Sequence, residues 1–453
     1  MQLTAFKTEA RLLLKLALPI LLAQLALTGL GVVDTIMSGQ VGTNDLAAIG
    51  LGTSIMLPVF MFSTGILLAI TPLVAKALGE SQPERITRYL NQGLWLSLPL
   101  GGLSLAILLN LEWVLDLLSL HEAVYQLTQD YLFYIAFGMP AIALYQVLRF
   151  FWEGLGTTLP TMWISFFALF LNIPLNAIFI YGMGPIEPMG AAGCGVASSI
   201  VMWVMLLLGI LYVMKSKLTK PFLALQKSVL GINWTTGLKP ILMLGIPTTF
   251  ALLFEVSLFS MIALFVAPLG AVVIAGHQIA INFTSLAFMV PLSFAMALTV
   301  RVGLGYGENN PAQLRLSLMT GFLFATVLGL LLAFISYFLR MDIVGLYSKD
   351  SEVLYLAASL LVFAAIYQVF DAIQVTAAGA LRGFHDSTIT MLVTFVSYWG
   401  IGLGLGYVFT FTDWIFAPMG VQGFWLGIVL GLLLASILLP LRLKRVYRLA
   451  VTK

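Results

Sequence analysis

The chain has 453 residues, of which 60% are hydrophobic and only 9% are charged, with a formal net charge of +3. Soluble domains carry roughly 25% charged residues, so this composition indicates a membrane protein with many spans and no large soluble domain. The single cysteine, Cys194, excludes an internal disulfide and a multi-cysteine metal site, and three scattered histidines do not form a metal cluster. The N-terminal apolar run has no small-residue cleavage site after it, so we expect it to continue as a span.

Apolar segments of about 20 residues, the length that crosses a bilayer as a helix, recur along the whole chain. They predict an all-α integral membrane protein. The twelve predicted transmembrane helices are 12–37, 45–75, 92–114, 127–148, 161–181, 191–213, 237–267, 273–300, 315–339, 354–381, 388–411 and 421–442.

The basic residues predict the orientation of these spans. With both termini on one side, the termini and the loops of that side hold 20 of the 22 lysines and arginines, and the other side holds only Arg340 and Lys349. Because basic residues concentrate on the cytoplasmic side, both termini are predicted to be cytoplasmic. A missed helix would place many of these basic residues on the opposite side. The uneven distribution of basic residues therefore also supports an even number of spans.

An internal repeat divides the chain into halves. Residues 16–80 align with 244–308 without a gap, and the matches include Pro19 with Pro247 and Gly79-Glu80 with Gly307-Glu308. Six spans in each half give the repeats the same orientation, which predicts two six-helix bundles related by a pseudo-two-fold axis along the membrane normal. The predicted parts are an N-lobe at 1–213, a basic cytoplasmic linker loop at 214–236 and a C-lobe at 237–453.

Three acidic residues lie inside apolar spans, with no basic residue within about two helical turns: Asp34, Glu255 and Asp371. An acid at the centre of a membrane helix costs about 2.5–3.5 kcal/mol on insertion scales. Such residues usually face a bundle interior or a watery cavity and mark ion or substrate paths. Asp34 is also compatible with an interfacial residue near the outer end of its span. Glu255 and Asp371 are also compatible with purely structural acids.

The repeat does not account for these acids, because Asp34 aligns with Ile262 and Glu255 aligns with Leu27. The second half holds two of them, so the cation site is predicted there. Tyr367 lies one turn before Asp371 on the same helix face and adds a phenol to the patch. Burial favours the neutral form of a carboxyl group, so such a site could exchange a proton or ionise when a cation arrives.

Other polar residues in the spans are weaker signals. Four of them are candidates for a substrate cavity, although asparagines between membrane helices often serve packing alone: Asn172, Asn176, Gln278 and Asn282. His277 lies near the outer end of its span, and we interpret it as an interfacial residue rather than a proton relay.

Several motifs together resemble the multidrug and toxic compound extrusion (MATE) family, in its bacterial NorM-like branch. They run from end to end of the chain and include VDTIMSG at 33–39, NIPLN at 172–176, LFEVSLF at 253–259, AAIYQVFDAIQV at 364–375 and LRGFHDST at 381–388. The resemblance implies a two-lobe exporter that expels cationic amphiphilic drugs in exchange for Na⁺ or H⁺ by alternating access. The acidic residues of the family fall on Asp34, Glu255 and Asp371, and its cation-site tyrosine falls on Tyr367.

From this resemblance we expect a non-enzymatic transporter with no cofactor beyond its coupling ion, Na⁺ or H⁺. Na⁺, if it is that ion, would bind at Glu255 and Asp371. The expected partners are cationic amphiphilic drugs and membrane lipid, not nucleic acid, and the expected state is a monomer in the bacterial inner membrane. A lipid or glycolipid flippase of the same superfamily is the alternative, but it would need a cationic cavity. A membrane enzyme would need clustered catalytic residues at one interface, and a channel does not explain the repeat.

Overall fold

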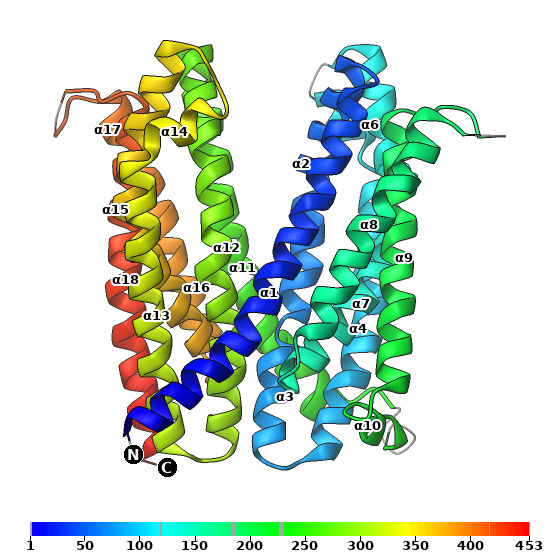
Figure 1. Ribbon diagram of the computed structural model, residues 1–453, viewed down its shortest axis with the longest axis vertical. Helices are drawn as coiled ribbons and strands as arrows, with labels where there is room; N and C mark the ends of the chain where they lie inside the picture. The colour runs from blue at the N-terminus through cyan, green and yellow to red at the C-terminus, as the bar shows by residue number, and fades with distance from the viewer. Residues whose placement is uncertain (1, 118–119, 184–185, 226–230, 416, 453) are drawn as a thin grey trace. The chain divides into compact units, whose positions relative to one another are not determined.

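The computed structural model describes residues 2–117, 120–183, 186–225, 231–415 and 417–452, and every element in these ranges is a helix (Figure 1). Eleven helices of the described residues are long and apolar enough to cross a membrane. The number is twelve when the bent pair α6 (Glu122–Ala136) and α7 (Met139–Gly154), which meet at 46°, is one span. The predicted all-α fold with twelve spans is confirmed.

The first half of the chain supplies six spans, one of them the bent α6–α7 pair. A second span consists of two helices in succession, α2 and α3, which together cover Thr43–Gly79. The other elements of this half are α1 (Gln2–Gly39), α2 (Thr43–Leu67), α3 (Ile70–Gly79), α4 (Pro83–Leu109), α5 (Glu112–Leu117), α8 (Leu159–Tyr181), α9 (Ala191–Lys215) and α10 (Lys220–Ala224).

The second half supplies the remaining six spans and includes π-helical turns. Its elements are η2 (Trp234–Leu238), α11 (Lys239–Val266), η3 (Ala267–Leu269), α12 (Ala271–Gly307), α13 (Pro311–Phe338), α14 (Arg340–Gly345), α15 (Ser351–Gly383), α16 (Ser387–Phe395), η4 (Val396–Leu405), α17 (Gly406–Phe411) and α18 (Val421–Val451). One span combines α16, η4 and α17 over Ser387–Phe411.

The repeat is visible in the local geometry of one turn in each half. The turn after α3 places Ser81 at φ 55°, and the turn after α12 places Asn309 at φ 48°, both in the left-handed region. Each turn is followed by a helix that begins with proline, Pro83 in α4 and Pro311 in α13. Proline suits the first turn of a helix, where its missing N–H leaves no bond unmade. The two aligned Gly-Glu segments therefore encode the same turn.

Two compact units make up the chain. Unit 1 comprises Met1–Ala17 and Phe250–Lys453, and unit 2 comprises Leu18–Thr249. Helix α1 therefore begins in unit 1 and continues into unit 2, and α11 begins in unit 2 and continues into unit 1. The segment predicted as a linker lies partly in α10 and η2, and its Lys227, like the terminal Lys453, lies outside the described residues.

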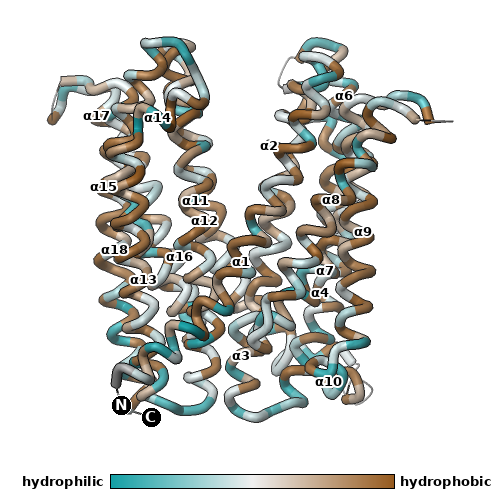
Figure 2. The backbone as a smooth tube through the Cα atoms, viewed as in Figure 1, coloured by the Kyte–Doolittle hydropathy of each residue, from teal (hydrophilic) through white to brown (hydrophobic). Residues whose placement is uncertain are grey.

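Each unit has its own apolar core. In unit 2, α7 packs against α3, α4 and α9 and buries Trp152. The rings of Trp152 and Tyr145 pack edge to face, with their centroids 6.0 Å apart. In unit 1, α15 packs against α12, α13 and α18 (Figure 1). It buries Leu361, with Phe424 and Trp425 of α18 in the same core. Hydrophobic residues run along the helices, and hydrophilic residues gather near helix ends and turns (Figure 2).

Candidate functional site

Two of the three predicted acids lie together in unit 1. Asp371 of α15 is 8% exposed, Glu255 of α11 is partly exposed, and their carboxyl groups interact electrostatically. Two carboxylates that repel each other favour the uptake of a proton or a cation between them. Among the described residues, no three His, Cys, Asp or Glu side chains converge as a metal cluster would require. The pair offers carboxylate oxygens, the ligand type that hard cations prefer.

Tyr367 is buried one turn before Asp371 and interacts with it electrostatically. Its hydroxyl forms a hydrogen bond with Thr284 of α12, and its ring packs against Trp425 of α18 with centroids 6.1 Å apart. The predicted phenol is thus held between three helices, beside the carboxylate. Gln374, one turn beyond Asp371, is hydrogen-bonded to that carboxylate from the other direction.

Asp34 lies in unit 2 within a separate polar network. Asn176 Nδ2 of α8 donates a 2.7 Å hydrogen bond to Asp34 Oδ1, and Ser198 Oγ of α9 donates one of 3.1 Å to Oδ2. Asn176 Nδ2 is also 3.0 Å from Asn172 Oδ1, one turn earlier in α8. Asp34 is only 8% exposed. Burial and three polar neighbours show that this carboxylate is held inside unit 2 rather than on its surface.

The Asp34 network has unused polar capacity. Within the described residues, Asn176 Oδ1 is buried without a hydrogen-bond partner, while Asn172 is hydrogen-bonded to Asp34 as well. Buried polar atoms normally have partners, so the Asn176 oxygen can accept one further hydrogen bond. The other two cavity candidates, Gln278 and Asn282, are exposed on α12 in unit 1. The structure therefore joins the two asparagines of α8 to an acid within unit 2.

His277, interpreted from the sequence as an interfacial residue, is buried inside unit 1. The side chain is 0% exposed, and Trp425 Nε1 donates a 3.2 Å hydrogen bond to its Nδ1. The sequence position near the start of a span suggested the interface, but α18 covers this end of α12. Its Nε2 has no hydrogen-bond partner among the described residues.

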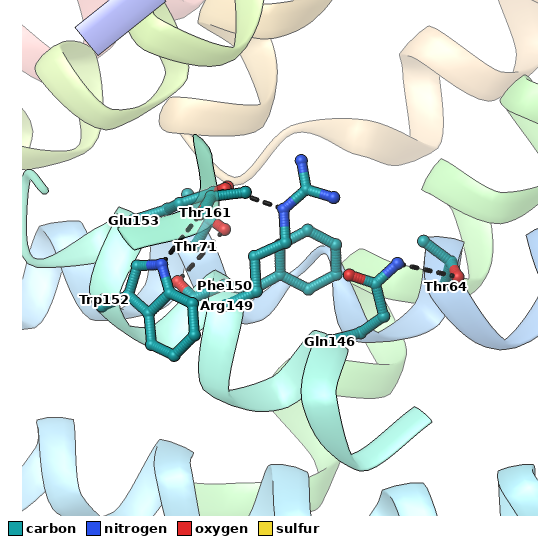
Figure 3. Close-up of polar contacts among 8 residues, drawn as sticks. All are labelled: Thr64, Thr71, Gln146, Arg149, Phe150, Trp152, Glu153 and Thr161. Carbon is teal, nitrogen blue, oxygen red and sulfur yellow. Dashed lines mark hydrogen bonds and ion pairs between the residues drawn. The ribbon is translucent and has the colours of Figure 1, made fainter. Parts of the chain in front are cut away.

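Sequence reasoning missed a buried ion pair in unit 2, shown in Figure 3. Arg149 Nε donates a 2.8 Å hydrogen bond to Glu153 Oε1, one turn further along α7, and both side chains are almost fully buried. Thr161 of α8 donates to the same Glu153 oxygen at 2.9 Å and accepts a 2.8 Å bond from Trp152 Nε1. The Arg–Glu spacing of four residues was the available signal.

A second missed cluster joins the N-terminal part of α1 to α12 and α13 within unit 1. Arg301 donates from Nε and Nη2 to the two oxygens of Glu9, at 2.9 and 2.6 Å. Ser317 Oγ donates to Glu9 Oε1 at 2.6 Å. This bidentate pair is the stronger, geometrically specific kind of ion pair. It explains why the first residues of the chain belong to unit 1.

Packed helices that cross a membrane, repeated in two halves with carboxylates inside each compact unit, are typical of a membrane transporter. The MatE family model matches residues 19–178 and 247–408, so the family unit occurs twice, once in each aligned half. The chain belongs to the MatE family, whose members are transporters and not enzymes.

Curated relatives cover nearly the whole chain. The multidrug resistance protein NorM of Photobacterium profundum is 40% identical over 97% of this chain and 96% of its own length. A probable NorM of Shewanella oneidensis is 43% identical over 97% and 95%. The multidrug resistance protein MdtK of Yersinia pseudotuberculosis is 41% identical over 96% and 95%.

Solved structures show the same fold. The eukaryotic MATE transporter AtDTX14 superposes with a TM-score of 0.86 at 21% identity, over 99% of both chains. An outward-facing multidrug resistance MATE transporter of the MOP superfamily gives a TM-score of 0.84 at 21% identity, over 97% of this chain and 96% of that one. At this identity the likeness concerns the fold alone.

Proposed function

We propose that this protein is a multidrug efflux antiporter, which exports small cationic amphiphilic compounds in exchange for Na⁺ or H⁺. The observation that carries the proposal is the proximity of Glu255 and Asp371 inside unit 1, with Tyr367 buried beside them. Two acids that cannot both stay ionised without a counter-charge give one site that a coupling cation and a cationic drug can compete for. Relatives named as multidrug resistance proteins support the same assignment.

In this mechanism the two repeat halves move so that the drug-binding region opens alternately to the cytoplasm and to the outside. With the binding region open to the cytoplasm, the acids attract a cationic drug. With the region open to the outside, Na⁺ or H⁺ binds Glu255 and Asp371, assisted by Tyr367, and displaces the drug. Asp34 serves unit 2 through its own network with Asn176, and a change in its protonation alters the hydrogen bonds between α1, α8 and α9.

The proposed setting is the bacterial inner membrane, with both termini cytoplasmic and the protein acting as a monomer surrounded by lipid. The basic residues near the termini support this orientation. Addition of a thiol-reactive impermeant reagent to whole cells that carry single-cysteine variants at Arg448 and at Lys349 would test it. Only the Lys349 variant should react from outside.

The experiment that tests the function is drug efflux from proteoliposomes, with Na⁺ and pH gradients imposed separately. Export of a fluorescent lipophilic cation driven by either gradient is the expected result. The absence of export with both gradients would overturn the antiport proposal. A flippase would instead move a labelled phospholipid between leaflets without a cation gradient, and the acidic character of both candidate sites argues against a phosphate-bearing substrate.

A further inference from the structure

The π-helical segment η4 lies against α18 in unit 1. A π-helix is rare, and in proteins it occurs frequently at functional sites. A side-chain carbon on Gly427 would overlap the carbonyl oxygen of Gly402, and one on Gly431 would overlap that of Ser397. Glycines on one face of α18 therefore let the two backbones approach closely. This contact fixes the backbone of η4 on both sides of Tyr398 and Trp399.

Neighbouring residues of η4 make hydrogen bonds to both helices that carry the acids. Trp399 Nε1 donates a 3.1 Å bond to Ser257 Oγ, two residues after Glu255 in α11. Gln374 Nε2, three residues after Asp371 in α15, donates a 2.6 Å bond to the hydroxyl oxygen of Tyr398. The segment η4 thus lies in direct polar contact with the helices on both sides of the acid pair.

The Tyr398 hydroxyl has a donor to spare. Tyr398 is 2% exposed, and its oxygen accepts from Gln374, so the phenolic proton remains available. Tyr398 interacts electrostatically with both Glu255 and Asp371. Gln374 is hydrogen-bonded to Asp371 as well. Asp371, Gln374 and Tyr398 form one polar network, with Glu255 within its electrostatic reach.

The other charge near this network is basic. Arg382, 8% exposed and three turns beyond Asp371 in α15, interacts electrostatically with Glu255. Among the described residues, the site therefore brings together two acids, one arginine and the two phenols of Tyr367 and Tyr398. When both acids are ionised, one negative charge remains unmatched, which a single coupling cation can neutralise.

We propose that Tyr398 is a positioning residue of the coupling site, held by η4 so that its hydroxyl donates to the acid pair when no cation is bound. The proposal rests on the proposed function. The hydroxyl stabilises the ionised acids between cation release and the next binding event, and the rigid contact with α18 keeps it in place. Loss of the hydroxyl makes the empty, ionised site less stable. The concentration at which the coupling cation binds the site changes as a result.

The test compares Tyr398→Phe with Tyr407→Phe in proteoliposomes. Tyr407 lies in the same span, but its side chain is 46% exposed and contacts Phe265 and Phe411 through its ring. Loss of one hydrogen bond to a charged group should change the concentration of the coupling cation at half-maximal efflux about tenfold in Tyr398→Phe. The half-saturating drug concentration should shift in the same direction, because drug and cation compete for the same acids, and Tyr407→Phe should match the wild type in both.

A second measurement does not depend on transport. Dicyclohexylcarbodiimide modifies protonated carboxyl groups in apolar surroundings, and mass spectrometry can follow its addition to Glu255 and Asp371. Without the phenol to stabilise the ionised form, labelling should be several-fold faster in Tyr398→Phe than in the wild type or in Tyr407→Phe. Equal labelling rates in the three proteins would overturn the inference. If the wild type shows cation-coupled efflux, an unchanged cation dependence of efflux in Tyr398→Phe would overturn it as well. A wild type that transports without any cation dependence would refute the antiport function, and the labelling rates would still decide the role of Tyr398.

Discussion

Arg149 and Glu153 form an ion pair of 2.8 Å within α7, and both side chains are almost fully buried. A Leu-Arg pair occurs in each half of the chain, Leu148-Arg149 and Leu381-Arg382, but the second arginine has a different environment. Asp386, four residues after Arg382, is bound instead by Arg442 at 2.6 Å. Arg149 of unit 2 is thus neutralised by Glu153, one turn away on its own helix. Arg382 of unit 1 interacts instead with Glu255 of the acid pair.

Glu153→Gln should destabilise the protein strongly. The substitution leaves Arg149 buried with a neutral partner, and the loss of one member of a buried pair typically costs about 3–5 kcal/mol. Thermal unfolding in detergent should begin at a clearly lower temperature than in the wild type. The control is Glu80→Gln, because the pair that Glu80 makes with Arg85 is more exposed and such pairs contribute about 0–1 kcal/mol. Equal unfolding temperatures for the two variants would contradict the assigned role of the buried pair.

Asp371→Asn should abolish cation-coupled efflux while the protein still inserts and folds. The substitution keeps the shape of the side chain but replaces one acceptor oxygen by an amide donor and removes the charge that a coupling cation needs. Efflux in proteoliposomes, together with the amount of monodisperse protein after purification, checks both parts. Wild-type efflux in this variant would exclude Asp371 from coupling. Asp413→Asn, a change in a loop on the opposite side from the termini, should leave efflux unaltered.

Asn176→Ala should impair efflux through Asp34. It removes the 2.7 Å donor to Asp34 Oδ1, and a hydrogen bond to a charged group contributes about 1.5–3 kcal/mol. Efflux should fall by roughly tenfold or more, and the combined Asp34→Asn/Asn176→Ala variant should lose no more than Asp34→Asn alone, because contacting residues are not additive. Additive losses would show that the two side chains act independently. Asn110→Ala, an exposed asparagine after α4, is the matched control.

Glu9→Gln should loosen the N-terminal part of α1 from unit 1. The two oxygens of Glu9 accept from Arg301, and the change replaces a bidentate ion pair in which both side chains are largely buried. Stability should fall by about 3 kcal/mol or more, and proteolysis near the N-terminus should become faster. Ser317→Ala, which removes one neutral donor to Glu9, should have a smaller effect. Glu84→Gln, a change of an exposed acid, serves as the control.

Gly427→Ala should disturb η4, because the added methyl group would meet the Gly402 carbonyl and the Gly406 backbone. Overpacking of this kind typically costs about 1–3 kcal/mol. Thermal stability and coupled efflux should both decrease. At Gly400, in the same segment, the nearest atom to an added methyl is Val396 Cγ1 at 3.9 Å, so Gly400→Ala should be tolerated. Similar losses from both variants would show that η4 needs glycine for flexibility rather than for close packing.

Much of the fold follows from local sequence. Apolar length alone predicted the twelve spans, since a helix must satisfy its own backbone inside a membrane. The aligned Gly-Glu turns, with Ser81 and Asn309 in left-handed conformations, kept their geometry in both halves because a short turn depends on few neighbours. The bend between α6 and α7 agrees with Pro140, which cannot donate a backbone hydrogen bond.

The sequence by itself determined that the chain is a helical membrane protein built from a repeat, with Asp34, Glu255 and Asp371 as costly buried acids. Only the tertiary structure decided their partners: Asn176 and Ser198 for Asp34, and Tyr398, through Gln374, for Asp371. It also revealed the hydrogen bond of His277 and the ion pairs of Glu153 and Glu9. The physical reason is that hydropathy measures the cost of a polar group in lipid, whereas its compensation comes from donors on other helices, far away in the sequence.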